Sequence, residues 1–341
     1  MVSFQDKLSQ GLVACGVDVS YDLDDEPYDA VLVIGGTRRL GKLRASRKRG
    51  VRIVQRLDGM NWVHRVRTTQ GRLRTGLRHY LRAEYGNWIL SIIRSRFADR
   101  IIYQSLFTQK WWERVHGLTS KPNSVVYNGV DLNVYNSGGS LGRPSDHFRV
   151  LMVEGSLMGG YEMGLEVALQ LVEQLAAAQK QEPRDMVELL VVGRVAPEVR
   201  ERWDGRISRT SASSNLLLTW QGEVQQARIP EIDRSAHVLY SADVNAACPN
   251  SVIEALACGL PVIAFDTGAL SELVMEDCGR VVPYGGDPWR LEPPDVQALA
   301  SATQEILNDQ ETFRRGARAR AESLFGLDEM VKKYLKVLLD T

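Results

Sequence analysis

A single carboxylate, Glu254, lies near the start of a short predicted helix, where it could bind hydroxyl groups of a ligand. The helix begins after Pro249 and ends at Gly259, because proline is typical of a helix start and glycine of its end. The first N–H groups of a helix lack backbone partners and carry about half a positive charge, which favours an anion such as phosphate. The two oxygens of Glu254 can accept two hydroxyl hydrogen bonds. The pattern predicts a site for phosphate and ribose, and a glutamate that merely favours the helix dipole is the alternative.

Three further loops each follow a predicted strand and are expected to lie beside this helix. In an open parallel sheet, ligands bind beyond the carboxyl ends of the strands, where such loops converge. The N–H groups of Asn250, Ser251 and Val252 could bind phosphate, and so could Arg194, which is otherwise a surface arginine. The three loops are Gly155-Ser156, Gly193-Arg194 and Gly222-Glu223, in which glycine also permits a close backbone approach without any ligand.

Strands and helices alternate along the chain, which predicts an α/β fold with parallel sheets in two facing Rossmann-like domains. The predicted strands are Ala30–Ile34, Val51–Gln55, Arg100–Gln104, Ser124–Tyr127, Arg149–Val153, Val187–Val192, Asn215–Trp220, His237–Tyr240, Pro261–Phe265 and Arg280–Val282. The predicted helices are Phe4–Cys15, Leu40–Lys48, one or two within Arg72–Phe97, Thr108–Val115, Met163–Ala178, Pro197–Trp203, Ser251–Cys258, Asp295–Asn308 and the terminal stretch Gln310–Leu339.

The length of the chain, 341 residues, favours two domains at about 150 residues each. The segment Asn136–Asp146 is rich in glycine and serine and is the expected linker. We expect an N-terminal domain at residues 1–138 and a C-terminal domain at residues 147–320. A last helix at residues 321–341 is expected to cross back to the first domain.

Composition excludes several classes of protein. No apolar run approaches the roughly 20 residues of a membrane span, and Asp6 and Lys7 stand where an export signal would be apolar. The four cysteines and five histidines show no metal-type spacing, so we expect no structural metal and a reducing compartment. A Rossmann oxidoreductase is disfavoured because no strand is followed by a Gly-x-Gly-x-x-Gly fingerprint. These observations predict a cytoplasmic protein without a cofactor.

The charge is zero overall but unevenly distributed. Between Arg38 and Arg114 there are 20 lysines and arginines against four acidic residues, a local charge of about +16. Such a segment could bind an anionic membrane surface or a phosphate-bearing acceptor, and a merely solvated basic face is the equal alternative. Nucleic acid is disfavoured, because Trp62, Tyr80 and Trp88 follow helical spacing rather than the pattern of an RNA-binding sheet. We expect a peripheral position at the inner membrane face.

Several motifs together carry a family resemblance: Ala98–Ser105, Asn128–Asp131, Gly222 and the Glu254 helix with Gly259, Pro261 and Gly268. Through them the chain resembles the group 1, or family 4, retaining glycosyltransferases of the GT-B fold. The resemblance implies that Glu254 binds the ribose of a nucleotide-sugar, with Asn250, Ser251 and Val252 along the diphosphate and sugar. It implies that the loop from Asp58 to His64 faces a carbohydrate or lipid-linked acceptor. Asp58 could equally form a structural salt bridge with Arg56, and His64 is otherwise a solvated residue.

The chain departs from this family at three places. The first acidic residue of the family's paired-glutamate motif is replaced by Ala246, and the segment Glu154–Tyr161 lacks the arginine and lysine that neutralise the diphosphate leaving group. Losing one such group typically costs about 3–4 kcal/mol of transition-state stabilisation. Such proteins also begin with a strand and a glycine-rich loop, so we expect an N-terminal element to be missing here. A divalent metal held by Asp243 and Glu154 is a disfavoured substitute.

Two hypotheses follow. The first is a retaining glycosyltransferase that moves a sugar from a nucleotide-sugar substrate to a carbohydrate or lipid-linked acceptor. The second is a degenerate relative that keeps the nucleotide pocket but acts as a binding or regulatory partner, and Ala246 with the absent cations favours it.

Overall fold

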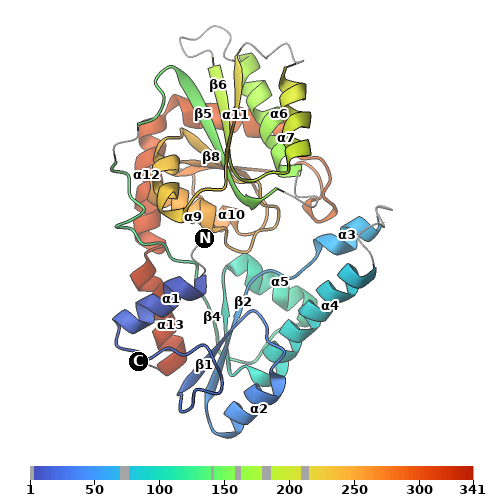
Figure 1. The fold of residues 1–341 in the computed structure, drawn as a ribbon, viewed down its shortest axis with the longest axis vertical. Helices are drawn as coiled ribbons and strands as arrows, with labels where there is room; N and C mark the ends of the chain where they lie inside the picture. The colour runs from blue at the N-terminus through green and yellow to red at the C-terminus, as the bar shows by residue number, and fades with distance from the viewer. Residues whose placement is uncertain are drawn as a thin grey trace.

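The computed structural model describes residues 4–69, 77–139, 142–157, 163–178, 186–208 and 215–340. They form two parallel sheets, one of four strands and one of six, each covered by helices on both faces (Figure 1). The α/β class with two parallel sheets is therefore confirmed. Within the described ranges no helix is long and apolar enough to cross a membrane.

The first sheet has the strand order β1-β2-β3-β4, with all neighbours parallel. Its helices α2, α4 and α5 bury apolar side chains against one face, where Trp112 and Ile53 are fully buried. Helix α1 covers the other face together with the C-terminal helix α13. The bounds are α1 Phe4–Ala14, β1 Ala30–Ile34, α2 Leu40–Lys48, β2 Arg52–Leu57, α3 Val63–Thr69, α4 Leu77–Ile92, a π-helical turn at Ile93–Phe97, β3 Arg100–Tyr103, α5 Leu106–His116 and β4 Asn123–Val125.

The second sheet has the order β10-β9-β8-β5-β6-β7, also parallel throughout. Helices α6, α7 and α11 cover one face, and α8, α9, α10 and α12 cover the other. The bounds are β5 His147–Ser156, α6 Met163–Ala178, β6 Met186–Arg194, α7 Pro197–Ile207, β7 Leu216–Gly222, a 3-10 turn η2 Gln226–Arg228, α8 Ile229–Arg234, β8 Val238–Tyr240, α9 Asn250–Ala257, β9 Val262–Phe265, α10 Leu270–Leu273, β10 Gly279–Val282, η3 Pro288–Arg290, α11 Val296–Asn308, α12 Gln310–Leu324 and α13 Leu327–Leu339.

Within the described residues the predicted strands and helices are present, with differences at their ends, and residues 72–76 of the predicted helical stretch lie outside those residues. Strand β2 extends to Leu57, two residues beyond its predicted end at Gln55. The terminal stretch forms two helices rather than one, because the chain is extended at Gly326. There Val130 donates its N–H to the carbonyl of Phe325 at 2.8 Å and accepts from the N–H of Leu327 at 3.0 Å. This short bridge lets α13 lie on the first domain beside α1 (Figure 1).

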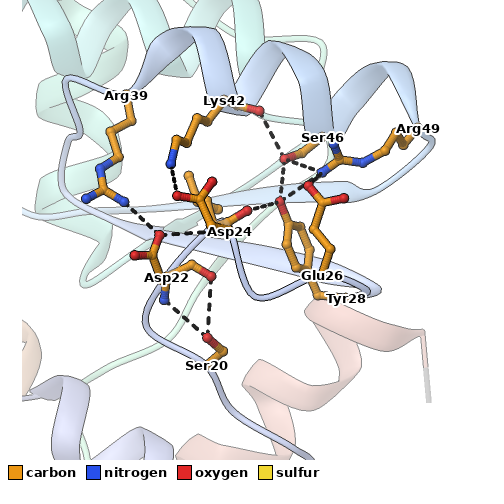
Figure 2. A network of polar contacts seen from close by, with 10 residues as sticks. Ser20, Asp22, Asp24, Glu26, Tyr28, Arg39, Lys42, Ser46 and Arg49 are labelled. Carbon is orange, nitrogen blue, oxygen red and sulfur yellow. Dashed lines mark hydrogen bonds and ion pairs between the residues drawn. The ribbon is translucent and has the colours of Figure 1, made fainter.

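An acidic segment before β1 packs against the basic helix α2 (Figure 2). Asp22 forms an ion pair with Arg39 at 2.8 Å, and Asp24 pairs with Lys42. Two turns further along, just after the last residue of the helix, Glu26 pairs with Arg49 at 2.7 Å. The basic charge that the sequence places on α2 is therefore largely neutralised within the domain.

The contact between α1 and α13 generates a prediction. A Cβ atom at Gly11 would lie 2.4 Å from Cγ2 of Val331, whereas one at Gly41 in α2 would meet no atom within 4 Å. Alanine gains up to about 1 kcal/mol over glycine inside a helix, but overpacking costs about 1–3 kcal/mol. We expect Gly41→Ala to raise the thermal unfolding midpoint and Gly11→Ala to lower it. Equal shifts for the two variants would show that α1 does not pack tightly on α13.

Candidate functional site

A cleft of about 430 Å³ separates the two domains. Its first-domain wall is formed where β2, β3 and β4 end, with Asp58, Gln104 and Asn128 among the lining residues. Its second-domain wall is the loop from Asp243 to Asn250, which leads from β8 into α9. The carboxyl ends of both parallel sheets thus open onto one space, as expected for ligand binding in such sheets.

Helix α9 points its first turn into this cleft. It begins at Asn250, which lines the cleft, and no side chain caps the helix. Its first N–H groups are therefore not taken by a side-chain cap and can bind an anion. Ser251 is half-buried, and the side chain of Val252 is fully buried in the core. Only the backbone of Val252 can therefore serve a ligand.

Glu254 lies one turn further along α9 and is 7% exposed. Its Oε1 atom accepts from the ammonium group of Lys7 in α1 at 3.2 Å. Burial raises the pKa of Glu254, and the positive charge of Lys7 opposes that rise. Sequence reasoning missed Lys7, because α1 is remote from α9 in the chain and carries no motif for a ligand.

Asn128 connects the two domains across the floor of the cleft. Its Oδ1 atom accepts from Nη2 of Arg56 at 2.7 Å. Its amide nitrogen donates to Oδ1 of Asn250 at 3.0 Å and to the carbonyl of Cys248 at 3.0 Å. Arg56 is thus joined to the first residue of α9 through one side chain. The salt bridge between Arg56 and Asp58 that the sequence allowed does not form.

The two predicted acceptor-side residues lie in different surroundings. Asp58 lines the cleft, and burial raises its pKa while the nearby charge of Arg56 opposes the rise. His64 is 8% exposed, and its Nε2 atom lies 2.8 Å from Oε1 of Glu84, so it is buried rather than solvated. His64 is not part of the cleft lining, so the structure brings only Asp58 to the cleft.

The remaining donor-side predictions lie at the ends of β5, β6 and β7. Arg194 points to the surface, where its guanidinium contacts Glu223 at 2.9 Å and its side chain is 57% exposed. Gly222 adopts a left-handed conformation with φ of 73°, and Gly155 is exposed. The side chain of Ser156 and residues 158–162 lie outside the described residues. The structure therefore places Arg194 away from the cleft and Asn250 in its lining, whereas Glu254 lies one turn behind Asn250 and is not part of the lining.

Two carboxylates, the exposed Asp243 and the half-buried Glu154, lie near Ala246, where the resemblance implies an acidic residue. Asp243 and Ala246 both line the cleft, and Gly268 packs against the backbone of Ala246, where an added Cβ would lie 2.4 Å from its nitrogen. Burial, followed by the charge of Asp243, raises the pKa of the half-buried Glu154 to about 8. No group of three His, Cys, Asp or Glu side chains in the described ranges converges as a metal site.

An aromatic cluster joins the domains at another part of the cleft wall. Trp289, on the turn η3 of the second domain, lies 5.2 Å from Trp62 and 5.0 Å from Trp111, centroid to centroid. Phe107 stacks on Trp289 at 6.2 Å. Trp62 and Trp111 also line the cleft, so their rings offer apolar surface for a ligand. The cluster could not be predicted from the sequence, because its members come from three distant segments.

The chain is similar to known proteins over both of its domains. Residues 149–309 match a family model described as glycosyl transferases group 1. A sucrose-phosphate synthase from Thermosynechococcus elongatus is 21% identical and has a TM-score of 0.64, over 91% of this chain and 73% of its own. HepE from Anabaena, solved in complex with UDP and glucose, is 18% identical, with a TM-score of 0.64 over 92% and 78%. A glycosyltransferase from Rickettsia africae is 16% identical, with a TM-score of 0.67 over 98% and 81%. A search of curated proteins found no match.

The raised pKa of Glu154 predicts how stability depends on pH. Between its ordinary value of 4.5 and about 8, the folded state binds a proton at Glu154 that the unfolded state has released. This contribution to stability is present at low pH and is lost as the pH rises through 8. We therefore expect the unfolding midpoint to fall between pH 5 and pH 8, and Glu154→Gln to flatten that fall. The measurement is thermal unfolding of both proteins across this range, and parallel curves would contradict the prediction.

Proposed function

We propose that this chain is a group 1 glycosyltransferase that transfers a sugar, with retention of configuration, from a nucleoside-diphosphate sugar to a carbohydrate or lipid-linked acceptor. The match of residues 149–309 to that family model and the GT-B fold shared with the solved neighbours support the proposal. The observation that carries the proposal is the uncapped first turn of α9 at the interdomain cleft, with Glu254 one turn behind Asn250.

The two ends of such a donor match the chemistry of α9. The first N–H groups of the helix suit the diphosphate, and the carboxylate of Glu254 suits the ribose hydroxyls. HepE, which shares the fold, has been solved in complexes with UDP and with UDP-glucose. The sugar would then lie toward Asp58 and the aromatic rings of Trp62 and Trp111, which line the same cleft.

The proposed reaction needs no side-chain nucleophile. The acceptor hydroxyl oxygen forms a bond to the anomeric carbon on the face from which the phosphate leaves. The bond between that carbon and the phosphate oxygen breaks, and its electron pair stays on the nucleoside diphosphate. The hydroxyl proton passes to a phosphate oxygen, so both products are complete without an added base. The protein's part is to hold the two substrates and to stabilise the departing charge.

Glu254 provides the direct test of the enzyme hypothesis. We expect Glu254→Ala to reduce release of nucleoside diphosphate from the accepted nucleotide-sugar by about 10²-fold or more, because the ribose loses a buried hydrogen-bond partner. The measurement is product release across a panel of nucleotide-sugars. Glu198→Ala, an exposed first-turn glutamate of α7, is the control and should retain the wild-type rate. Binding without release by the wild-type protein would support the degenerate binding module instead.

Helix α4 bears an exposed apolar stripe that supports a membrane-associated acceptor. Leu77, Leu81, Tyr85 and Trp88 recur at helical spacing and are 45 to 74% exposed. Their positions fall on one side of the helix, since residues three and four apart are neighbours. A stripe of leucine with tyrosine and tryptophan is typical of helices that lie at a lipid interface.

Positive charge surrounds this stripe. Arg78 and Arg82 follow it along α4, and within the described ranges neither forms an ion pair. Arg38 contacts the ring of Tyr85 at 5.8 Å. The hydrogen bond from Arg65 lowers the pKa of Glu84 to about 2, so the acidic residue on this helix is already paired. This basic face would be repelled by the same face of a second copy of the chain, whereas anionic lipid would attract it.

Vesicle binding tests this surface. We expect the protein to sediment with vesicles containing phosphatidylserine and not with neutral vesicles, more strongly at low salt than at high salt. The double variant Leu81→Ser and Trp88→Ser should lose most of this binding. Met275→Ser, which removes an exposed apolar side chain of the second domain, should retain it. Concentration-dependent dimerisation that the same double variant abolishes would assign the stripe to a second copy instead.

A further inference from the structure

We propose that Arg56 and Lys7, both from the first domain, supply the positive charge that neutralises the diphosphate of the donor. This inference rests on the proposed function, because it concerns the same donor site. Departure of a nucleoside diphosphate places charge on phosphate oxygens. The segment Glu154–Tyr161 contains no arginine or lysine, where the resemblance to group 1 glycosyltransferases implies two. The chain therefore needs another source of positive charge at the first turn of α9.

Arg56 is held at that turn. It is 5% exposed and lines the cleft, and its Nη2 atom bonds Asn128, which in turn bonds Asn250. The Nε atom of Arg56 is buried and has no hydrogen-bond partner in the described part of the chain. Nε itself is too buried to meet a ligand, so a phosphate oxygen would bind the N–H groups at the outer edge of the guanidinium. The guanidinium thus has spare hydrogen-bonding capacity beside the cleft.

Phe4 fixes the plane of this guanidinium. Its ring centroid lies 3.7 Å from Cζ of Arg56, and Phe4 itself lines the cleft. A ring stacked on one face of a guanidinium leaves the N–H groups at its edge directed outward. Phe4 is therefore a positioning residue that holds Arg56 ready for a phosphate.

Lys7, one turn after Phe4 in α1, supplies the second positive charge. Its Nζ atom lies 3.2 Å from Glu254, and its side chain is only 13% exposed. Asn250 and Glu254 are one helical turn apart, about 5.4 Å, which a flexible lysine stem can span. When ribose hydroxyls approach Glu254, the ammonium group can move toward the phosphates without leaving the site. Arg56 and Lys7 would thus lie beside the first and second turns of α9.

Arg194, the predicted phosphate-binding cation of the second domain, does not supply positive charge at the first turn of α9. Arg194 is paired with Glu223 at the surface, where its side chain is 57% exposed. The cations of the first domain reach the site because α13 anchors α1 and Asn128 anchors Arg56. The two domains would therefore share the binding of one donor molecule.

The test compares the affinities of UDP and uridine, with ADP and GDP and their nucleosides in parallel, by isothermal titration calorimetry. We expect Lys7→Met and Arg56→Met each to lower the ratio of nucleoside diphosphate to nucleoside affinity by about 10- to 100-fold, as for loss of one charge-assisted hydrogen bond. Inorganic pyrophosphate should compete with the nucleotide in the wild-type protein and less well in either variant. Arg56→Lys should keep part of the affinity.

Two controls separate charge from stability. Lys110→Met removes an exposed positive charge from α5, and Arg94→Met removes a buried arginine that contacts Tyr103 and Gly117 away from the cleft. Neither should change the affinity ratio. Unchanged ratios in Lys7→Met and Arg56→Met, or a loss seen only in Arg194→Met, would overturn the inference and leave the donor site intact. A wild-type protein that binds no nucleoside diphosphate at all would overturn the proposed function together with the inference.

Discussion

The burial of one carboxylate constrains the arrangement of both domains. Glu254 is enclosed in an apolar helix of the second domain, where a negative charge is costly without a partner. Its partner Lys7 comes from α1, and α1 is held by apolar contacts with α13 and the first sheet. Helix α13 reaches that sheet only because the chain is extended at Gly326 and pairs there with Val130. One ion pair therefore depends on a crossing between domains at the end of the chain.

The cleft is polar along its floor and aromatic along part of its wall. Asn128 links Arg56 to Asn250, so a displacement of either domain changes the surroundings of the first turn of α9. Trp289 packs on rings of the first domain, which adds an apolar contact between the same two bodies. A donor bound at α9 would thus be sensitive to the relative position of the domains, because the groups around it come from both.

The elements could be predicted from sequence because their signals are local. Strand periodicity and the start and end residues of α9 identified the fold class and the helix that carries Glu254. The contact of Lys7 with Glu254 could not be predicted, since the two residues are 247 positions apart and lysine on an amphipathic helix is usually solvated. The same holds for Trp289 and its partners. Arg194 illustrates the opposite case, in which a residue in a suitable loop pairs with a neighbour at the surface.

The acidic segment beside α2 affects how the first domain would orient in an electric field. Asp22, Asp24 and Glu26 cancel the charges of Arg39, Lys42 and Arg49 on one flank of the domain (Figure 2). The positive charges of Arg78 and Arg82 on α4 are not cancelled by ion pairs within the described ranges. The domain is therefore an electrical dipole rather than a uniformly basic body, and near a negatively charged plane it would experience a torque as well as an attraction. That torque would favour one orientation of the protein before any apolar side chain touched the surface.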